Sequence, residues 1–173
     1  MSTLASKSVY FGNKVSDERN KTISKITIHH MADIADPENC AKYHLKTEKA
    51  SANYYIGSDG TIVSGVGENR RAWASSNANN DQMAITIEVS NNKKEPEWSV
   101  SDKAYESLIN LCVDICIRYD ITLNWTGDKN GTLTCHYMFK KTECPGPYLK
   151  ARMGNIANTV NYLVEQKKFN IYN

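Results

Sequence analysis

The chain has 173 residues, with 21 Lys and Arg against 19 Asp and Glu and a formal net charge of +2. This length suits one domain with its own hydrophobic core, and we expect a single domain over residues 1–173. A nearly balanced charge without a basic run argues against nucleic-acid binding. No apolar run is long enough to span a bilayer, and the first ten residues lack the apolar region of a secretory signal peptide. We therefore expect synthesis in the cytoplasm and no membrane insertion.

The first half of the chain contains strand and hairpin patterns. Residues 1–20 are polar with little periodicity and predict a surface arm or loop. Residues 25–30, Lys-Ile-Thr-Ile-His-His, alternate and are β-branched, which predicts a strand. Asp36 and Pro37 favour the start of a helix that continues to about Lys46. Asp59-Gly60, between the β-rich segments 53–56 and 61–63, predicts a hairpin.

The second half alternates between strands and helices. Residues 67–83 are polar and predict a long loop, and residues 84–89 predict a strand. Apolar side chains recur at helical spacing over residues 101–119, with Ser99 or Ser101 as the cap. A short extended segment, 132–136, precedes a final helix from about residue 148 to 167. This order predicts an α/β fold, with a central sheet flanked by helices.

The five cysteines do not form the pattern of a disulfide framework, because their number is odd and they are scattered. Cys112 and Cys116 lie one helical turn apart on the apolar stripe of the predicted helix, so we expect both in the core. Cys135 precedes a histidine and is also expected to be buried. Cys144 stands directly before Pro-Gly, in a segment that ends regular structure.

Histidines and a cysteine mark the ends of the predicted strands. His29 and His30 end one strand, His136 ends the extended segment, and Cys144 follows eight residues later. Open α/β sheets place their sites at such strand ends. Two imidazoles and a thiolate can hold zinc and leave the fourth position open for catalysis. The spacing alone is weak evidence, because isolated histidines are more often ordinary core or surface residues.

Five segments strengthen this interpretation because they resemble, in order, motifs of one enzyme family. They are Ile-Thr-Ile-His-His-Met-Ala at 26–32, Ser-Ala-Asn-Tyr…Asp-Gly-Thr-Ile at 51–62, Arg-Ala-Trp-Ala at 71–74, Ala-Ile-Thr-Ile-Glu at 84–88, and Cys-His…Thr-Glu-Cys-Pro-Gly at 135–146. Together they resemble the amidase-2 family of N-acetylmuramoyl-L-alanine amidases, which includes phage endolysins and peptidoglycan recognition proteins. The resemblance covers roughly residues 24–165 and implies a mixed central sheet flanked by helices.

The resemblance implies a metal site and its ligands. The family's first zinc-binding histidine falls on His29, with His30 in packing or support, and the other two ligands fall on His136 and Cys144. A cysteine ligand favours zinc over magnesium or calcium. The implied cofactor is therefore Zn²⁺, and the implied partner is bacterial peptidoglycan.

The resemblance also implies catalytic and substrate-binding residues. Glu88 matches the family's general base; one family branch instead has a tyrosine at the position of Ala52. Thr142 occupies the position that stabilises the oxyanion. Trp73 is expected to line the groove for sugar or peptide, although a core position is about as plausible. Asn53 stands where many relatives have a histidine, which leaves its substrate-binding role open.

These expectations define a leading hypothesis and its rivals. The leading hypothesis is a zinc amidase that cuts the bond between N-acetylmuramic acid and L-alanine. A phage endolysin would fit, released to the cell wall through a holin, and no separate wall-binding domain is seen. One alternative is a non-catalytic peptidoglycan-binding protein, which often lacks the cysteine ligand. Another is a cysteine peptidase that uses Cys135 or Cys144. A glycosidase would need two carboxylates across one cleft, and the sequence does not single out such a pair.

Overall fold

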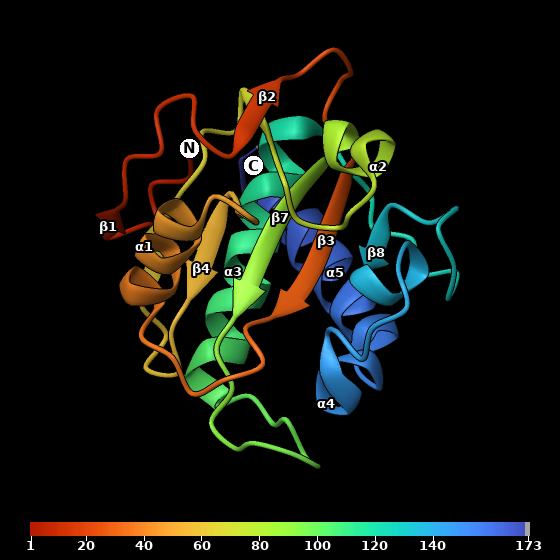
Figure 1. Ribbon diagram of the computed structural model, residues 1–173. Helices are drawn as coiled ribbons and strands as arrows, with labels where there is room; N and C mark the ends of the chain where they lie inside the picture. Colours follow the sequence, from red (N-terminus) through yellow and green to blue (C-terminus); the bar gives the residue numbers. More distant parts are fainter. Residues whose placement is uncertain (172–173) are drawn as a thin grey trace.

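The computed structural model describes residues 1–171 and is built on a six-stranded mixed sheet (Figure 1). The strand order is β1-β5-β4-β7-β3-β8, and β2 and β6 form a separate antiparallel pair. Within the large sheet, β4 and β5 are antiparallel and the other neighbours are parallel. The strands are β1 Lys7–Ser8, β2 Ser16–Glu18, β3 Lys25–His30, β4 Tyr54–Ile56, β5 Ile62–Ser64, β6 Arg70–Ala72, β7 Ala84–Val89 and β8 Leu133–Cys135.

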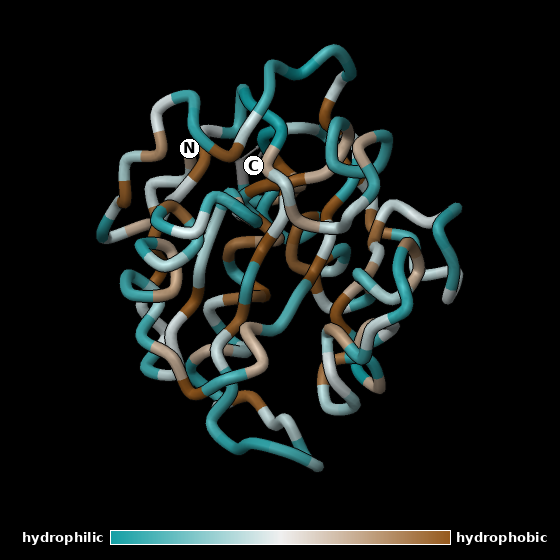
Figure 2. The backbone as a smooth tube through the Cα atoms, in the orientation of Figure 1, coloured by the Kyte–Doolittle hydropathy of each residue, from teal (hydrophilic) through white to brown (hydrophobic). Residues whose placement is uncertain are grey.

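Helices cover both faces of this sheet. In Figure 1, α3 and α5 lie behind the sheet, and α1 lies on the front near β4. The helices are α1 Pro37–Thr47, α2 Ala78–Met83, α3 Asp102–Tyr119, α4 Gly146–Lys150 and α5 Met153–Ile171, with a 3₁₀ turn at His136–Met138. Figure 2 shows hydrophobic segments gathered in the inner strands and helices, with hydrophilic segments in the outer loops. The predicted α/β architecture is confirmed.

The two faces of the central strands differ in chemistry. Successive side chains of a strand point to opposite faces. Ile26 and Ile28 of β3, with Ile85 and Ile87 of β7, pack into the large core together with apolar side chains of α3 and α5. The alternating positions are polar, and Thr27 Oγ1 lies 2.8 Å from Thr134 Oγ1 of β8. The helices behind the sheet therefore cover its apolar face, while its polar face is left for a site.

Local capping explains where two of the predicted helices begin. Asp36 accepts a hydrogen bond from Asn39 N at 2.9 Å, with Pro37 as the first residue of α1. Ser101 accepts one from Ala104 N at 3.1 Å at the start of α3. Both starts agree with the sequence-based prediction.

Three predictions of local structure were wrong. Residues 1–20 are not a bare arm, because they contribute β1 and β2 and bury Val9, Phe11 and Val15 in a second core cluster. The predicted loop 67–83 contains β6 and α2. The predicted final helix is divided into α4 and α5. These elements are short or depend on pairing with distant segments, so they leave little local periodicity.

Over residues 1–171, none of the helices combines the length and apolar character that a bilayer-spanning segment requires.

Candidate metal centre and active site

The register of the parallel strands places His29 beside Glu88. These two residues are direct partners across β3 and β7, and Glu88 is in turn the partner of Tyr55 on β4. Partners in register point to the same face of a sheet. His29 and Glu88 therefore emerge on the polar face, at the carboxyl ends of two adjacent strands. His30 belongs to the opposite face and packs edge-on against Trp98, with 5.3 Å between ring centroids.

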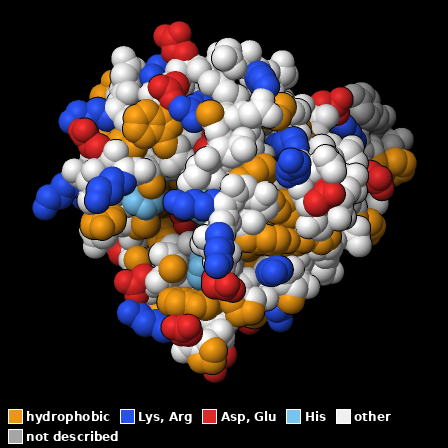
Figure 3. All heavy atoms as spheres, turned by 45° about the vertical axis from the view of Figure 1, so that its right-hand side comes forward, with side chains coloured by type: hydrophobic (Ala, Val, Ile, Leu, Met, Phe, Trp, Pro, Cys, Tyr) orange, Lys and Arg blue, Asp and Glu red, His pale blue; other side chains and the backbone are white. Residues whose placement is uncertain are grey.

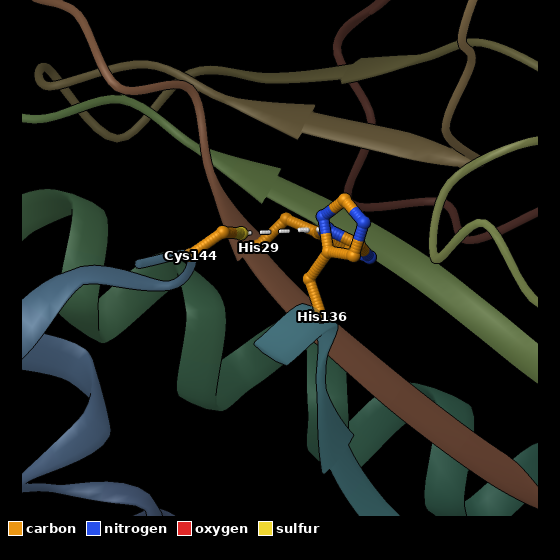
Figure 4. Close-up of side chains that lie close together, drawn as sticks. All are labelled: His29, His136 and Cys144. Carbon is orange, nitrogen blue, oxygen red and sulfur yellow. Dashed lines mark hydrogen bonds between the residues drawn. The ribbon is translucent and has the colours of Figure 1, made fainter. Parts of the chain in front are cut away.

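His136 and Cys144 reach the same place from the segment after β8. His136 opens the 3₁₀ turn directly after that strand, and Cys144 lies just before α4. Tyr137 N donates to Cys144 O at 3.2 Å, which ties the two ends of the intervening loop together. A ligand atom from each of His29, His136 and Cys144 lies within 4.8 Å of the others. Figure 4 shows the three side chains converging, with Cys144 Sγ 3.5 Å from His29 Nδ1.

The electrostatics of the two imidazoles suit metal binding. His29 is only 1% exposed, and burial, together with the nearby histidines, lowers its pKa well below the usual value. Burial also lowers the pKa of His136, with a further contribution from Lys140. Both rings are therefore neutral at pH 7, which is the form that binds a metal. Within residues 1–171, His29 Nε2 and His136 Nε2 are buried without a hydrogen-bond partner.

Cys144 lies in an environment that does not stabilise a free thiolate. Burial raises its pKa well above the usual value, and the negative charge of Glu88 raises it further. A thiolate at this position therefore needs a cation beside it. The neutral imidazoles, the buried sulfur and the unpartnered nitrogens fit a soft divalent ion such as zinc.

Glu88 lines the pocket next to this cluster. That pocket holds about 330 Å³ and is also lined by His136, Thr142 and Cys144. Burial raises the pKa of Glu88 to about 8, and its Oε2 atom is buried without a partner among the described residues. A carboxyl group with a pKa near neutrality can both take and release a proton. Thr142 Oγ1 accepts from Cys144 N at 3.3 Å, so its hydroxyl hydrogen remains available.

The structure places Trp73 and Asn53 in different surroundings. Trp73 is 37% exposed and lines a pocket of about 400 Å³ that also reaches His136. Asn53 is completely buried, its Oδ1 accepts from Thr86 N at 3.0 Å, and its Nδ2 donates to Val66 O at 3.0 Å. Asn53 therefore joins β4 to β7, and its position gives no support to contact with substrate.

Trp98 and Glu95 also line the pocket beside Glu88, and neither was predicted from the sequence. Both lie in the segment between β7 and α3, where the sequence has no periodicity. The signal that could have identified Trp98 is its position shortly after the strand that carries the predicted catalytic residue Glu88.

Figure 3 shows histidine side chains in a hollow of the molecular surface, with basic and acidic side chains close by. Such a hollow, with an acid–base group and three metal donors, is typical of a metal-dependent hydrolase. A family profile described as N-acetylmuramoyl-L-alanine amidase matches residues 19–147, and the chain belongs to this family. Membership supports a peptidoglycan amidase activity.

Solved structures of similar fold extend over nearly the whole chain. An endolysin amidase, LysCS from Clostridium intestinale URNW, is 23% identical, with a TM-score of 0.66, and the match covers 91% of this chain and 99% of that one. PlyL is 18% identical with a TM-score of 0.71, covering 89% and 95%. The hydrolase AmiA of Staphylococcus aureus is 14% identical with a TM-score of 0.71, covering 94% and 85%. No curated protein sequence matches the chain.

Proposed function

We propose that this protein is a zinc-dependent N-acetylmuramoyl-L-alanine amidase, with His29, His136 and Cys144 as the metal ligands. The observation that carries the proposal is the convergence of these donors beside Glu88, with two buried imidazole nitrogens lacking a partner in the described chain. Unpartnered buried polar atoms are costly, so their occurrence on two of the three clustered side chains indicates a ligand. When bound, zinc would polarise the scissile carbonyl and make water easier to deprotonate.

The remaining chemistry belongs to residues of the chain. Glu88 takes a proton from the attacking water and delivers it to the alanine nitrogen as the carbon–nitrogen bond breaks. Its pKa of about 8 suits both steps near neutral pH. Thr142 donates a hydrogen bond to the oxygen on which negative charge develops. Trp73 offers an apolar wall to the substrate in the adjoining pocket.

The environment of the cysteines argues against a cysteine peptidase. A nucleophilic cysteine needs a lowered pKa, whereas burial raises the pKa of both Cys144 and Cys135. Cys135 is also the register partner of Ile28 and lies in the apolar core. The non-catalytic alternative is disfavoured because all three metal donors and Glu88 occur together.

We extend the proposal to an endolysin-type role on the bacterial cell wall. In this role the chain, taken as one catalytic domain over residues 1–173, would be phage-encoded and released from the cytoplasm through a holin. The support is the family membership and the fold shared with LysCS, an amidase whose name describes it as an endolysin. Lysis of cells that produce the protein, only after their membrane is permeabilised, would test this role.

The test of the catalytic proposal is the metal dependence of peptidoglycan cleavage. The purified protein should contain about one zinc per chain, as a three-ligand site requires. A chelator should abolish the release of peptides with new alanine amino termini, and added zinc should restore it. Binding to the wall without any cleavage would instead indicate the non-catalytic alternative.

A further inference from the structure

Two pockets of opposite charge meet at His136. The first, here called the cationic pocket, is lined by Lys49, Arg71, Trp73, Lys140 and His136, and holds about 400 Å³. The second, here called the Trp98 pocket, is lined by Glu95, Trp98, Glu143, His30 and His136, and holds about 330 Å³. The Trp98 pocket is the pocket that also contains Glu88, Thr142 and Cys144, so it includes the metal centre, whereas the cationic pocket extends from His136 towards Trp73.

The cationic pocket has positive charge available to a substrate. Lys49 and Lys140 are exposed and form no ion pair within residues 1–171, whereas Arg71 is paired with Asp17. The acidic residue in the lining, Asp81, is 1% exposed, and its carboxylate accepts hydrogen bonds from the backbone of Ala74 and Ser75. Its charge is therefore turned towards the protein interior.

The Trp98 pocket has the opposite character. Glu95 and Glu143 present exposed carboxylates, and neither Lys nor Arg is among the described residues that line it. The backbone of Trp98 is fixed, since its carbonyl accepts from Asn91 Nδ2 at 2.8 Å and its N–H donates to Lys94 O at 3.1 Å. The pocket thus has an indole that stands on a fixed backbone and packs edge-on against His30, beside hydrogen-bond acceptors.

His30 provides an independent indication of a ligand. This residue lines the Trp98 pocket and is only 7% exposed. The ring interacts with the side chain of Asn91, while its Nδ1 atom is buried without a hydrogen-bond partner among the described residues. A buried ring nitrogen of this kind is a polar group that a bound molecule could satisfy.

The scissile amide joins a sugar and a peptide, and these two parts of the substrate differ in charge as the two pockets do. The amide bond consumes the carboxyl group of the muramic acid, so the sugar side is an uncharged N-acetylated sugar with several hydroxyl groups. The peptide side keeps at least its terminal carboxylate. An anionic peptide is attracted by the cationic pocket and repelled by Glu95 and Glu143, whereas sugar hydroxyls donate readily to carboxylates.

We propose that the Trp98 pocket is the subsite for the N-acetylmuramic acid residue, with Trp98 as the apolar platform and Glu95 and Glu143 as acceptors for its hydroxyl groups. This inference rests on the proposed amidase function and adds the direction in which the substrate crosses the metal centre. In this orientation, the peptide of the bound substrate extends from the metal centre into the cationic pocket, on the side of Trp73.

The experiment compares two substrates with the same lactyl–alanine amide and the same peptide. One is the N-acetylmuramoyl peptide, and the other is the (R)-lactoyl peptide, which lacks the sugar ring. The variants are Trp98→Ala, Trp98→Phe and Glu95→Gln. Glu97→Gln serves as the matched control, since it removes a charge from the same loop at an exposed residue that does not line the pocket.

Trp98→Ala should raise KM for the muramoyl peptide by about tenfold, the size of one aromatic contact, and raise KM for the lactoyl peptide by a much smaller factor. Trp98→Phe should restore most of the loss, Glu95→Gln should raise the same KM by a smaller factor, and Glu97→Gln should change neither substrate. Equal losses on both substrates, or no loss on either, would overturn the subsite. A wild-type circular dichroism spectrum and midpoint of thermal unfolding show that each variant is folded.

A binding measurement separates this inference from the proposed function. N-acetylmuramoyl methylamide carries the sugar without a peptide, and its binding can be followed by NMR without any cleavage. The wild-type protein should bind it, and Trp98→Ala should weaken binding by a similar factor. Such a result in a protein that cleaves neither substrate would support the subsite and refute the amidase proposal. Equal binding by both proteins would refute the subsite.

Discussion

Two glutamates with opposite surroundings, the buried Glu68 and the partly buried Glu88, distinguish the structural part of this molecule from its reactive part. Glu68 is 4% exposed and accepts hydrogen bonds from Arg118, Tyr54 and Tyr119, at 2.6 to 2.8 Å. Burial by itself would raise its pKa, but these hydrogen bonds outweigh burial and lower the pKa to about 2. Within residues 1–171, Glu88 has no such partners, and burial raises its pKa to about 8.

The difference shows how the same side chain is used for stability or for chemistry. A carboxylate with all its partners in place holds segments together, and Glu68 joins the loop after β5 to α3 and to the amino terminus. A carboxyl group left without partners costs stability but keeps its capacity to exchange protons. Buried polar groups without partners are therefore the better guide to the active site of this protein.

The largest expected effect is the loss of activity in Glu88→Gln. Removing a general base lowers the rate by about 10² to 10⁴, and kcat on purified peptidoglycan measures this loss. Zinc content and thermal stability should stay at the wild-type level, because the amide replaces a carboxyl group that has few partners. Glu97→Gln is the control for a charge change alone. Full activity in Glu88→Gln would remove Glu88 from the mechanism.

Glu68→Gln should lower the stability of the protein and leave its activity unchanged, the reverse of Glu88→Gln. It leaves Arg118 without its main carboxylate partner, which costs about 3 kcal/mol of unfolding free energy, at the lower end for buried pairs because Arg118 is partly exposed. Urea unfolding measures the loss, and kcat per folded molecule should be unchanged. If kcat falls and stability does not, the roles assigned to the two glutamates are wrong.

The pH dependence of stability should have opposite signs for the two residues. The lowered pKa of Glu68 contributes stability that is present above pH 4.5 and is lost as the pH falls towards 2. The raised pKa of Glu88 favours the folded protein below pH 4.5, and that advantage is lost as the pH rises towards 8. Each group contributes a slope of at most about 1.4 kcal/mol per pH unit.

Unfolding in urea at several pH values, with a chelator present, would measure both slopes. Each glutamine variant should lose only its own slope relative to the wild-type protein. Identical pH profiles for the wild-type protein and both variants would contradict the assigned pKa directions.

The smallest expected effect is that of Tyr119→Phe. It removes one hydrogen bond to Glu68, at 2.8 Å, and leaves the ring in place. The expected cost is about 1 kcal/mol, the usual net value of one hydrogen bond. No loss in urea unfolding would show that the hydrogen bond from Tyr119 does not contribute to holding Glu68.

The sequence predicted an element where its residues show local periodicity, and it predicted site residues where a segment resembles a motif of the family. The strand over 25–30 and the helix over 101–119 follow from their periodicity, and both were confirmed. The candidate ligands stood in family-like segments, although their spacing alone was a weak signal. The Glu68 cluster was not predicted, because its partners Arg118 and Tyr119 lie 50 and 51 residues away in the sequence and no local pattern joins them to Glu68. The short strands β1, β2 and β6 were missed because two or three residues show no alternation.

The most direct test of the central claim is digestion of peptidoglycan in ¹⁸O-labelled water, followed by immediate reduction and mass spectrometry of the products. Hydrolysis of the muramoyl–alanine amide places the label in the lactyl carboxylate of the glycan and none at an anomeric carbon or in a peptide carboxylate. That result is predicted for the wild-type protein and should be lost in Glu88→Gln. Label at a new reducing end would indicate a glycosidase, label in a peptide carboxylate would indicate a peptidase, and either would contradict the account.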